Sequence, residues 1–160
     1  MTALHHRKYI RLRGYDYSRP GYYFVTICTH GRERLFGTVR KGEMQLSPAG
    51  TIARKCWLAI PEHFPQVSLD KFCIMPDHLH GILIIQTLQA PIPSDKIINR
   101  TRRGHFGPQS MNLGSIIRGF KAGVTTRCKI HGLSVHWQSR YHDHIIRSHA
   151  SLERIRKYIE

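Results

Sequence analysis

The sequence is poor in acidic residues. Its 160 residues include only 10 Asp and Glu against 25 Lys and Arg, so the formal net charge is +15. An enzyme that acts on small neutral metabolites needs no such surplus. The excess of positive charge indicates a polyanionic partner, either nucleic acid or an anionic membrane surface.

Long apolar runs are also missing. The longest one near the middle of the chain is Ile82–Ile85, whereas a membrane-spanning helix needs about 20 apolar residues. Residues 1–10 contain no apolar stretch of the kind found in signal peptides. The four cysteines are spread out with no Cys-x-x-Cys pair, which is typical of reduced thiols rather than of disulfides or zinc ligands. We therefore expect a cytoplasmic, nucleoid-associated protein.

The composition suits a single domain over residues 1–160. Hydrophobic residues make up 41% of the chain, which is enough to fill one core at this length. Residues 1–20 combine basic and aromatic side chains and are expected to form a basic arm. Residues 86–109 are rich in proline, glycine and basic residues, which predicts a long, mobile basic loop.

Apolar periodicity predicts an α+β fold. The expected strands lie at 22–29, within 36–46, at 67–75, at 78–85 and within 137–147, and the expected helices begin after Ser47, at Leu113 and after Ser148 or Ser151. Pro76-Asp77 predicts a turn between the strands at 67–75 and 78–85, and Pro48 suits the first position of the helix that Ser47 caps. Without the second strand of the first hairpin, this order is βαββαβ followed by the last helix. It predicts a ferredoxin-like antiparallel sheet with helices on one face, plus an extra N-terminal hairpin strand.

The sharpest local feature is His78-Leu79-His80. Residues i and i+2 of a strand point to the same face, so both imidazoles project together while Leu79 enters the opposite face. Two neutral imidazoles side by side form half of a site for a divalent metal. The alternative is a pair of surface or hydrogen-bonded core histidines, because a chain with 12 histidines contains such pairs by chance.

A second pair, His142-Asp143-His144, lacks the apolar middle residue. A zinc hydrolase that uses both pairs is therefore a weaker alternative than a site built on the first pair alone.

The last helix carries the second candidate feature. Tyr158 flanks the apolar stripe of this helix, with Arg154 one turn behind it and Lys157 adjacent. Positive charge near a tyrosine stabilises the phenolate and binds phosphate, as a phosphoryl-transfer nucleophile requires. Core packing of Tyr158 is the alternative interpretation, and Tyr141 is the competing nucleophile.

Basic residues interleaved with aromatics would hold phosphates and stack bases, although each alone could simply be solvated. The residues expected to contact DNA are Arg11, Arg13, Tyr15, Lys96, Arg100, Arg102, Arg103, Lys121, Arg154 and Lys157.

Four segments together resemble a known family. They are residues 14–29, residues 75–82 (Met-Pro-Asp-His-Leu-His-Gly-Ile), Phe120-Lys121, and residues 137–147. They are similar to REP-associated tyrosine transposases, which are insertion-sequence-200-like single-tyrosine transposases of the HUH endonuclease superfamily. The resemblance runs from about Arg7 to Glu160, and the family usually has Asn where Asp77 stands.

The resemblance implies a ferredoxin-like fold and metal-dependent cleavage of single-stranded DNA. It gives His78 and His80 the role of metal ligands and Tyr158 the role of a nucleophile that bonds to a 5′ phosphate. The family's further polar residue near the metal would lie beyond Glu160, so no third protein ligand is assigned. The C-terminal helix 149–160 is accordingly expected to be truncated. Mg²⁺ or Mn²⁺ is the expected cofactor, since two histidines plus oxygen ligands leave room for phosphate oxygens.

The predicted function is therefore an endonuclease or transposase that cleaves and rejoins hairpin-associated, REP-like single-stranded DNA. The alternative is a non-catalytic binding protein for single-stranded DNA or RNA on the same scaffold. Monomer and homodimer both stay open.

Overall fold

The computed structural model describes residues 12–87 and 111–160. Residues 1–11 of the expected basic arm and residues 88–109 of the expected basic loop therefore lie outside the described residues. Within the described part of the chain, no helix is long and apolar enough to cross a membrane. The regular elements are β1 (Gly21–Cys28), the short 3-10 turn η1 (His30–Arg32), β2 (Gly37–Arg40), β3 (Glu43–Leu46), α1 (Pro48–Leu58), α2 (Ile60–His63), β4 (Val67–Met75), β5 (His78–Ile85), α3 (Leu113–Ile130), β6 (His142–Ile146) and α4 (His149–Ile159).

Four of the strands form a central antiparallel sheet in the order β4-β5-β1-β6. The predicted mixed α+β class is thus confirmed. β4 and β5 have the predicted bounds and are joined by the predicted turn at Pro76-Asp77. The strand predicted within 137–147 is β6, His142–Ile146, and Trp137 before it forms an isolated bridge with Thr29.

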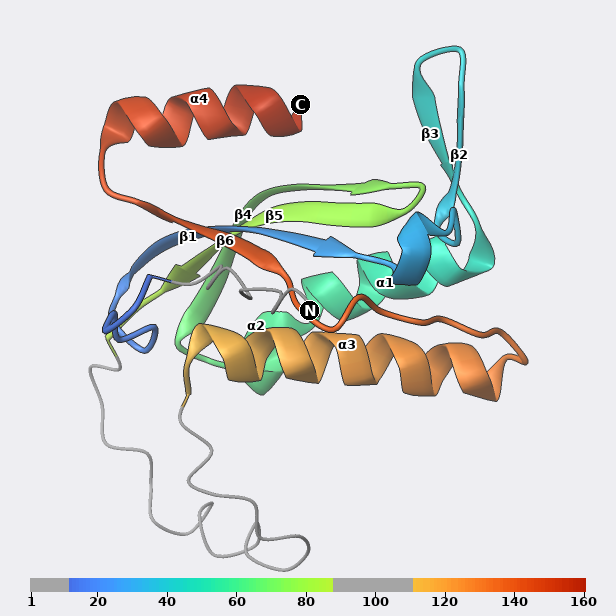
Figure 1. Ribbon diagram of the computed structural model, residues 1–160, viewed down its shortest axis with the longest axis horizontal. Helices are drawn as coiled ribbons and strands as arrows, with labels where there is room; N and C mark the ends of the chain where they lie inside the picture. Colours follow the sequence, from blue (N-terminus) through green and yellow to red (C-terminus); the bar gives the residue numbers. More distant parts are fainter. Residues whose placement is uncertain (1–11, 88–110) are drawn as a thin grey trace, which may run out of the picture.

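The sheet has a helix layer on each face (Figure 1). α1 and α3 cover one face, over a core that includes Tyr23, Val25 and Leu79. α4 covers the other face, where Leu152 and Ile159 pack with residues of β5 and β6. The expectation that the helices lie on one face is therefore wrong for α4. Its apolar stripe is matched by a second, smaller apolar patch on the opposite face of the sheet.

Successive side chains of β5 point alternately to the two faces of the central sheet. Leu79 is fully buried against the α1 and α3 layer, and Gly81 leaves room for the Trp57 ring of α1 on the same face. A Cβ on Gly81 would come within 2.3 Å of a Trp57 ring carbon. His78 and His80 consequently face the α4 layer.

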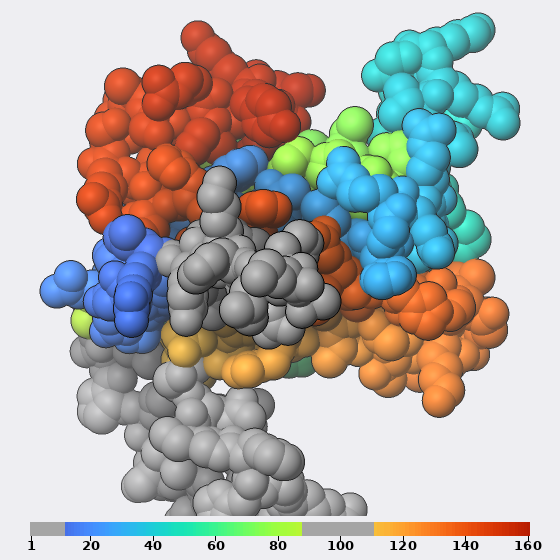
Figure 2. Space-filling model, viewed as in Figure 1, coloured from blue at the N-terminus to red at the C-terminus, as the bar shows by residue number. Residues whose placement is uncertain are grey.

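The prediction of an extra N-terminal hairpin strand beside the central sheet is also wrong. Residues 37–46 form a separate two-stranded hairpin, β2–β3, that does not join the central sheet. Its two-residue turn places Lys41 at φ 52° and Gly42 at φ 81°, the backbone of a tight hairpin turn, so the two short strands pair with each other. Figure 2 shows this hairpin and α4 as separate projections from one side of the molecule, with a hollow between them.

Local caps fix where the helices begin. Ser47 caps α1, with Pro48 at its first position as predicted, and its hydroxyl accepts from the Gly50 amide. α4 begins after Ser148 rather than after Ser151, and the Ser148 hydroxyl accepts from the Ser151 amide.

Candidate metal and tyrosine site

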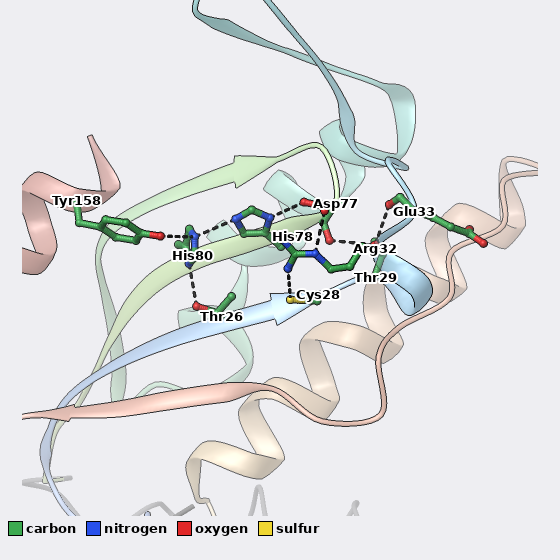
Figure 3. Close-up of polar contacts among 9 residues, drawn as sticks. All are labelled: Thr26, Cys28, Thr29, Arg32, Glu33, Asp77, His78, His80 and Tyr158. Carbon is green, nitrogen blue, oxygen red and sulfur yellow. Dashed lines mark hydrogen bonds and ion pairs between the residues drawn. The ribbon is translucent and has the colours of Figure 1, made fainter. Parts of the chain in front are cut away.

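The two histidines of β5 converge, as the strand pattern predicts. Nε2 of His78 lies 2.9 Å from Nε2 of His80, and both rings lie on the sheet face covered by α4 (Figure 3). Both side chains are partly buried, while Leu79 between them lies in the core. The geometry therefore presents two imidazole nitrogens to one point in space.

The other nitrogen of each ring is held by a neighbouring side chain. Nδ1 of His78 lies 2.5 Å from Oδ1 of Asp77, and Nδ1 of His80 lies 2.8 Å from Oγ1 of Thr26. An Nδ1–H that donates to an oxygen orients the ring and leaves Nε2 as a free acceptor, which is the tautomer of a metal-binding imidazole.

The pKa values of His80 and Asp77 fit a neutral imidazole at His80 and an ionised carboxylate at Asp77. Burial is the main cause that lowers the pKa of His80 to about 4, and the positive charge of Arg32 lowers it further. Burial acts to raise the pKa of Asp77, but its hydrogen bond from His78 and the charge of Arg32 lower it overall. At neutral pH His80 is therefore uncharged, with a lone pair available.

A divalent ion fits this pair of nitrogens. Two ligands about 2.1 Å from one ion and at right angles to each other lie about 3.0 Å apart, close to the observed 2.9 Å. With both Nδ1 atoms donating, the Nε2 lone pairs face each other, and a shared cation relieves their repulsion. Over residues 12–87 and 111–160, no group of three or more His, Cys, Asp and Glu side chains could hold a metal ion. Two nitrogen ligands would leave the other coordination positions of a divalent ion to oxygen ligands from substrate or water.

Tyr158 lies next to this pair. Its hydroxyl oxygen is 3.4 Å from Nε2 of His80, and the side chain is 67% exposed. Phe24 of β1 stacks on the His80 ring and meets the Tyr158 ring edge-on, at centroid distances of 5.5 Å and 6.2 Å. The alternative that Tyr158 is a core residue is thus not what the structure shows: the ring rests on a neighbour while its hydroxyl reaches solvent.

α4 is docked onto the sheet at both its apolar stripe and a charged edge. Leu152 and Ile159 are buried against the patch that contains Ile82. Nε and Nη2 of Arg156 donate to Oδ2 of Asp70 on β4, at 3.0 Å and 2.6 Å. These contacts hold the helix that carries Tyr158 over the histidine pair.

The competing candidates lie elsewhere. Tyr141 is only 8% exposed and belongs to the main core. His142 and His144 are exposed on β6, on the same sheet face as His80, but β1 separates them from it. Two strand spacings amount to about 9–10 Å, too far for the two pairs to share one ion.

The five described residues that are expected to contact DNA differ in exposure and in surroundings. Arg13, Arg154 and Lys157 are exposed, whereas Tyr15 packs against the main core. The Lys121 ammonium donates to the backbone oxygen of Gln138 at 2.7 Å and lies 5.9 Å from the centre of the Trp137 ring. Burial lowers the pKa of Lys121, and this lysine is engaged inside the protein. The remaining five, Arg11, Lys96, Arg100, Arg102 and Arg103, lie outside the described residues.

Sequence reasoning missed three members of the site: Thr26, the carboxylate of Asp77 and Arg32. The Pro76-Asp77 pair predicts only a turn, although an acidic residue immediately before a candidate ligand is a signal for an orienting hydrogen bond. Thr26 could have been found only from the register of β1 on β5, which pairs it with His80.

Comparison with known proteins identifies a solved structure with the same fold and a relative with a similar sequence. No protein-family model matches the chain. A solved structure of a REP-associated tyrosine transposase bound to a REP hairpin superposes with a TM-score of 0.60 and 21% identity, over 93% of this chain and 69% of that one. An uncharacterized protein of Haemophilus influenzae (strain Rd) is 42% identical over 161 residues, which cover 99% of this chain and 89% of the relative. The chain therefore has the fold of the solved transposase and belongs to the same family as the Haemophilus influenzae protein.

Proposed function

We propose that the protein is a metal-dependent, single-tyrosine nuclease and transposase of the HUH type, formed by one domain with a ferredoxin-like strand order. It cleaves and rejoins hairpin-associated single-stranded DNA through a covalent 5′-phosphotyrosine. The observation that carries the proposal is the exposed Tyr158 hydroxyl 3.4 Å from Nε2 of His80, whose neighbour His78 presents its own Nε2 at 2.9 Å.

The chain's own side chains prepare this chemistry. Thr26 and Asp77 orient the two imidazoles, whose Nε2 atoms approach each other beside Tyr158 of α4. Phe24 supports both His80 and Tyr158, which limits the positions that the phenol can adopt. Preorganisation of this kind reduces the entropy lost when the reacting groups meet.

The bond changes balance without a nucleotide cofactor. The Tyr158 oxygen bonds to phosphorus and its proton passes to solvent, while the bond from phosphorus to the 3′ oxygen breaks and that oxygen takes a proton from solvent to leave as a 3′-hydroxyl. The phosphotyrosine conserves the bond energy, so attack by another 3′-hydroxyl rejoins DNA and regenerates the tyrosine.

His78 and His80 would hold the metal, Mg²⁺ or Mn²⁺. When bound, the ion would polarise the scissile phosphate and offset the charge that develops in the transition state.

Two further observations support DNA as the partner. The formal net charge of +15 suits a polyanion, and the solved structure with the same fold is bound to a REP hairpin. Arg13, Arg154 and Lys157 are exposed cations that would contact the DNA backbone.

The test is an adduct assay. Purified protein is incubated with Mn²⁺ or Mg²⁺ and a single-stranded oligonucleotide that carries a hairpin from DNA flanking the gene, and the products are separated under denaturing conditions. We expect a metal-dependent covalent protein–DNA adduct. Salt-sensitive binding without an adduct at any metal would instead support the non-catalytic binding protein.

A further inference from the structure

Arg32 lies at the far end of the row of polar groups that begins with Tyr158 (Figure 3). Its Nε is 2.9 Å from Oδ2 of Asp77, the carboxylate whose other oxygen contacts His78. Its Nη1 is 3.0 Å from the sulfur of Cys28. One carboxylate thus connects the guanidinium to the histidine pair.

The guanidinium has capacity for a further partner. Arginine has five N–H donors, and these two contacts engage Nε and Nη1. Within the described residues, Nη2 donates no hydrogen bond. The Arg32 side chain is 56% exposed, against 20% for Asp77. The ion pair with Asp77 therefore holds the Arg32 guanidinium in place and leaves it accessible to solvent.

The backbone under Arg32 is held in an uncommon conformation. Arg32 has φ 59° and follows Gly31 at φ 60°, so a non-glycine residue occupies the left-handed region, which is uncommon and is seen mostly at turns and functional sites. The turn is tied directly to the start of β5. The Thr29 amide and hydroxyl both donate to the backbone oxygen of Asp77, at 3.0 Å and 2.9 Å, and the Thr29 hydroxyl also approaches the Glu33 oxygen at 2.7 Å.

These contacts fix the position of Arg32 relative to His78. The turn at Pro76-Asp77 is further joined to the same loop by the Phe36 amide, which donates to the Pro76 oxygen at 2.9 Å. An exposed arginine whose backbone and Nε are both anchored beside a candidate phosphate site is preorganised for bidentate contact with a phosphate.

We infer that Arg32 is a binding residue for a backbone phosphate of the nucleic-acid strand, held by Asp77 at a fixed position beside the histidine pair. The inference rests on the proposed function, and it adds a phosphate-binding residue at the end of the site opposite Tyr158. The bound strand then lies along the row from Tyr158 through His80 and His78 to Arg32, in the hollow between α4 and the β2–β3 hairpin (Figures 2 and 3).

Arg34 provides a matched control. It is an exposed arginine two residues along the same loop, so Arg34→Ala removes the same charge without touching Asp77. The variants are Arg32→Ala, Arg32→Gln and Arg34→Ala, each checked by thermal unfolding. Arg32→Gln removes the charge at similar length and is the variant to use if Arg32→Ala does not fold.

Binding is measured by fluorescence anisotropy of a labelled hairpin-bearing single-stranded oligonucleotide in EDTA, over a series of salt concentrations. We expect Arg32→Ala and Arg32→Gln to weaken binding about 10-fold or more, as loss of a charged hydrogen bond does. The slope of log Kd against log salt should fall by about 0.7, the value for one contact to a single strand. Arg34→Ala should change Kd by only about twofold, since a solvated charge contributes through the general field.

The outcomes separate the inference from the proposed function. Equal changes in Kd and salt slope for the Arg32 and Arg34 variants, or no binding by the wild type, would overturn the inference. If the wild type forms the covalent adduct while the two arginines behave alike, the function stands and the Arg32 contact does not. If the wild type binds but forms no adduct, the function fails, and a selective loss in the Arg32 variants still supports the contact.

Discussion

The hydroxyl oxygen of Tyr158 lies 3.4 Å from Nε2 of His80, although 78 residues separate them in the chain. α4 brings the tyrosine to the sheet face opposite the main core, and strand alternation on β5 turns the histidine toward the same face. The proposed chemistry depends on this meeting of a helix end and a strand.

Tyr158→Phe should abolish the covalent adduct, because it removes the nucleophilic oxygen. DNA binding in EDTA and thermal stability should change little, since the hydroxyl is exposed. Tyr22→Phe is the control, because Tyr22 is also an exposed tyrosine and lies on β1 of the central sheet rather than on α4. An adduct that persists in Tyr158→Phe but not in Tyr141→Phe would move the nucleophile to Tyr141.

His78→Ala and His80→Ala should each remove Mn²⁺ binding in calorimetry and stop cleavage, because one imidazole alone makes a weak site. Binding of the oligonucleotide in EDTA should remain. His142→Ala is the matched control, an exposed histidine on the same sheet face across β1. Equal loss of Mn²⁺ affinity in His142→Ala would contradict the site at His78 and His80.

Asp77→Ala should weaken Mn²⁺ binding about 10- to 100-fold, the usual effect of losing a group that orients a metal-binding histidine. Asp77→Asn should have a smaller effect, because its amide oxygen can still accept from Nδ1 of His78. The comparison is informative because the resembling transposases usually have Asn here. If both variants bind Mn²⁺ as the wild type does, Asp77 does not orient His78.

Much of this arrangement could be predicted from the sequence because it depends on local rules. The bounds of β4 and β5 follow from alternation and from the Pro76-Asp77 turn, and the start of α1 follows from Ser47-Pro48. The convergence of His78 and His80 needs only the two-residue period of a strand.

The parts that could not be predicted depend on long-range packing. The Leu152 and Ile159 stripe of α4 shows that the helix is amphipathic, but not which face of the sheet it covers. Arg32 joins the site through a left-handed backbone and a partner 45 residues away, Asp77, for which no periodicity exists. From the sequence alone, Arg32 is one of many basic residues that contribute to the positive charge of the surface.

Gly81→Ala should destabilise the fold by about 1–3 kcal/mol, the cost of overpacking a filled core. The new Cβ would lie 2.3 Å from the fully buried Trp57 ring, which has no room to retreat. Gly123→Ala in α3 is the control: its Cβ would meet only the Cys56 sulfur, at 3.9 Å, and it should stabilise the helix by about 0.5–1 kcal/mol. Thermal and urea unfolding measure both, and equal stabilities would show that Trp57 does not pack on Gly81 as described.

Arg156 and Asp70 should act together in holding α4 over the histidine pair. We expect Arg156→Met and Asp70→Asn each to slow adduct formation, because the ion pair that anchors the Tyr158 helix to β4 is lost in either. The double variant should be little slower than the single ones, since the same contact is removed only once. The pair is partly exposed, so its coupling energy in urea unfolding should be about 1 kcal/mol or less. Rates that multiply independently in the double variant would mean that Tyr158 is positioned by the apolar stripe of α4 alone.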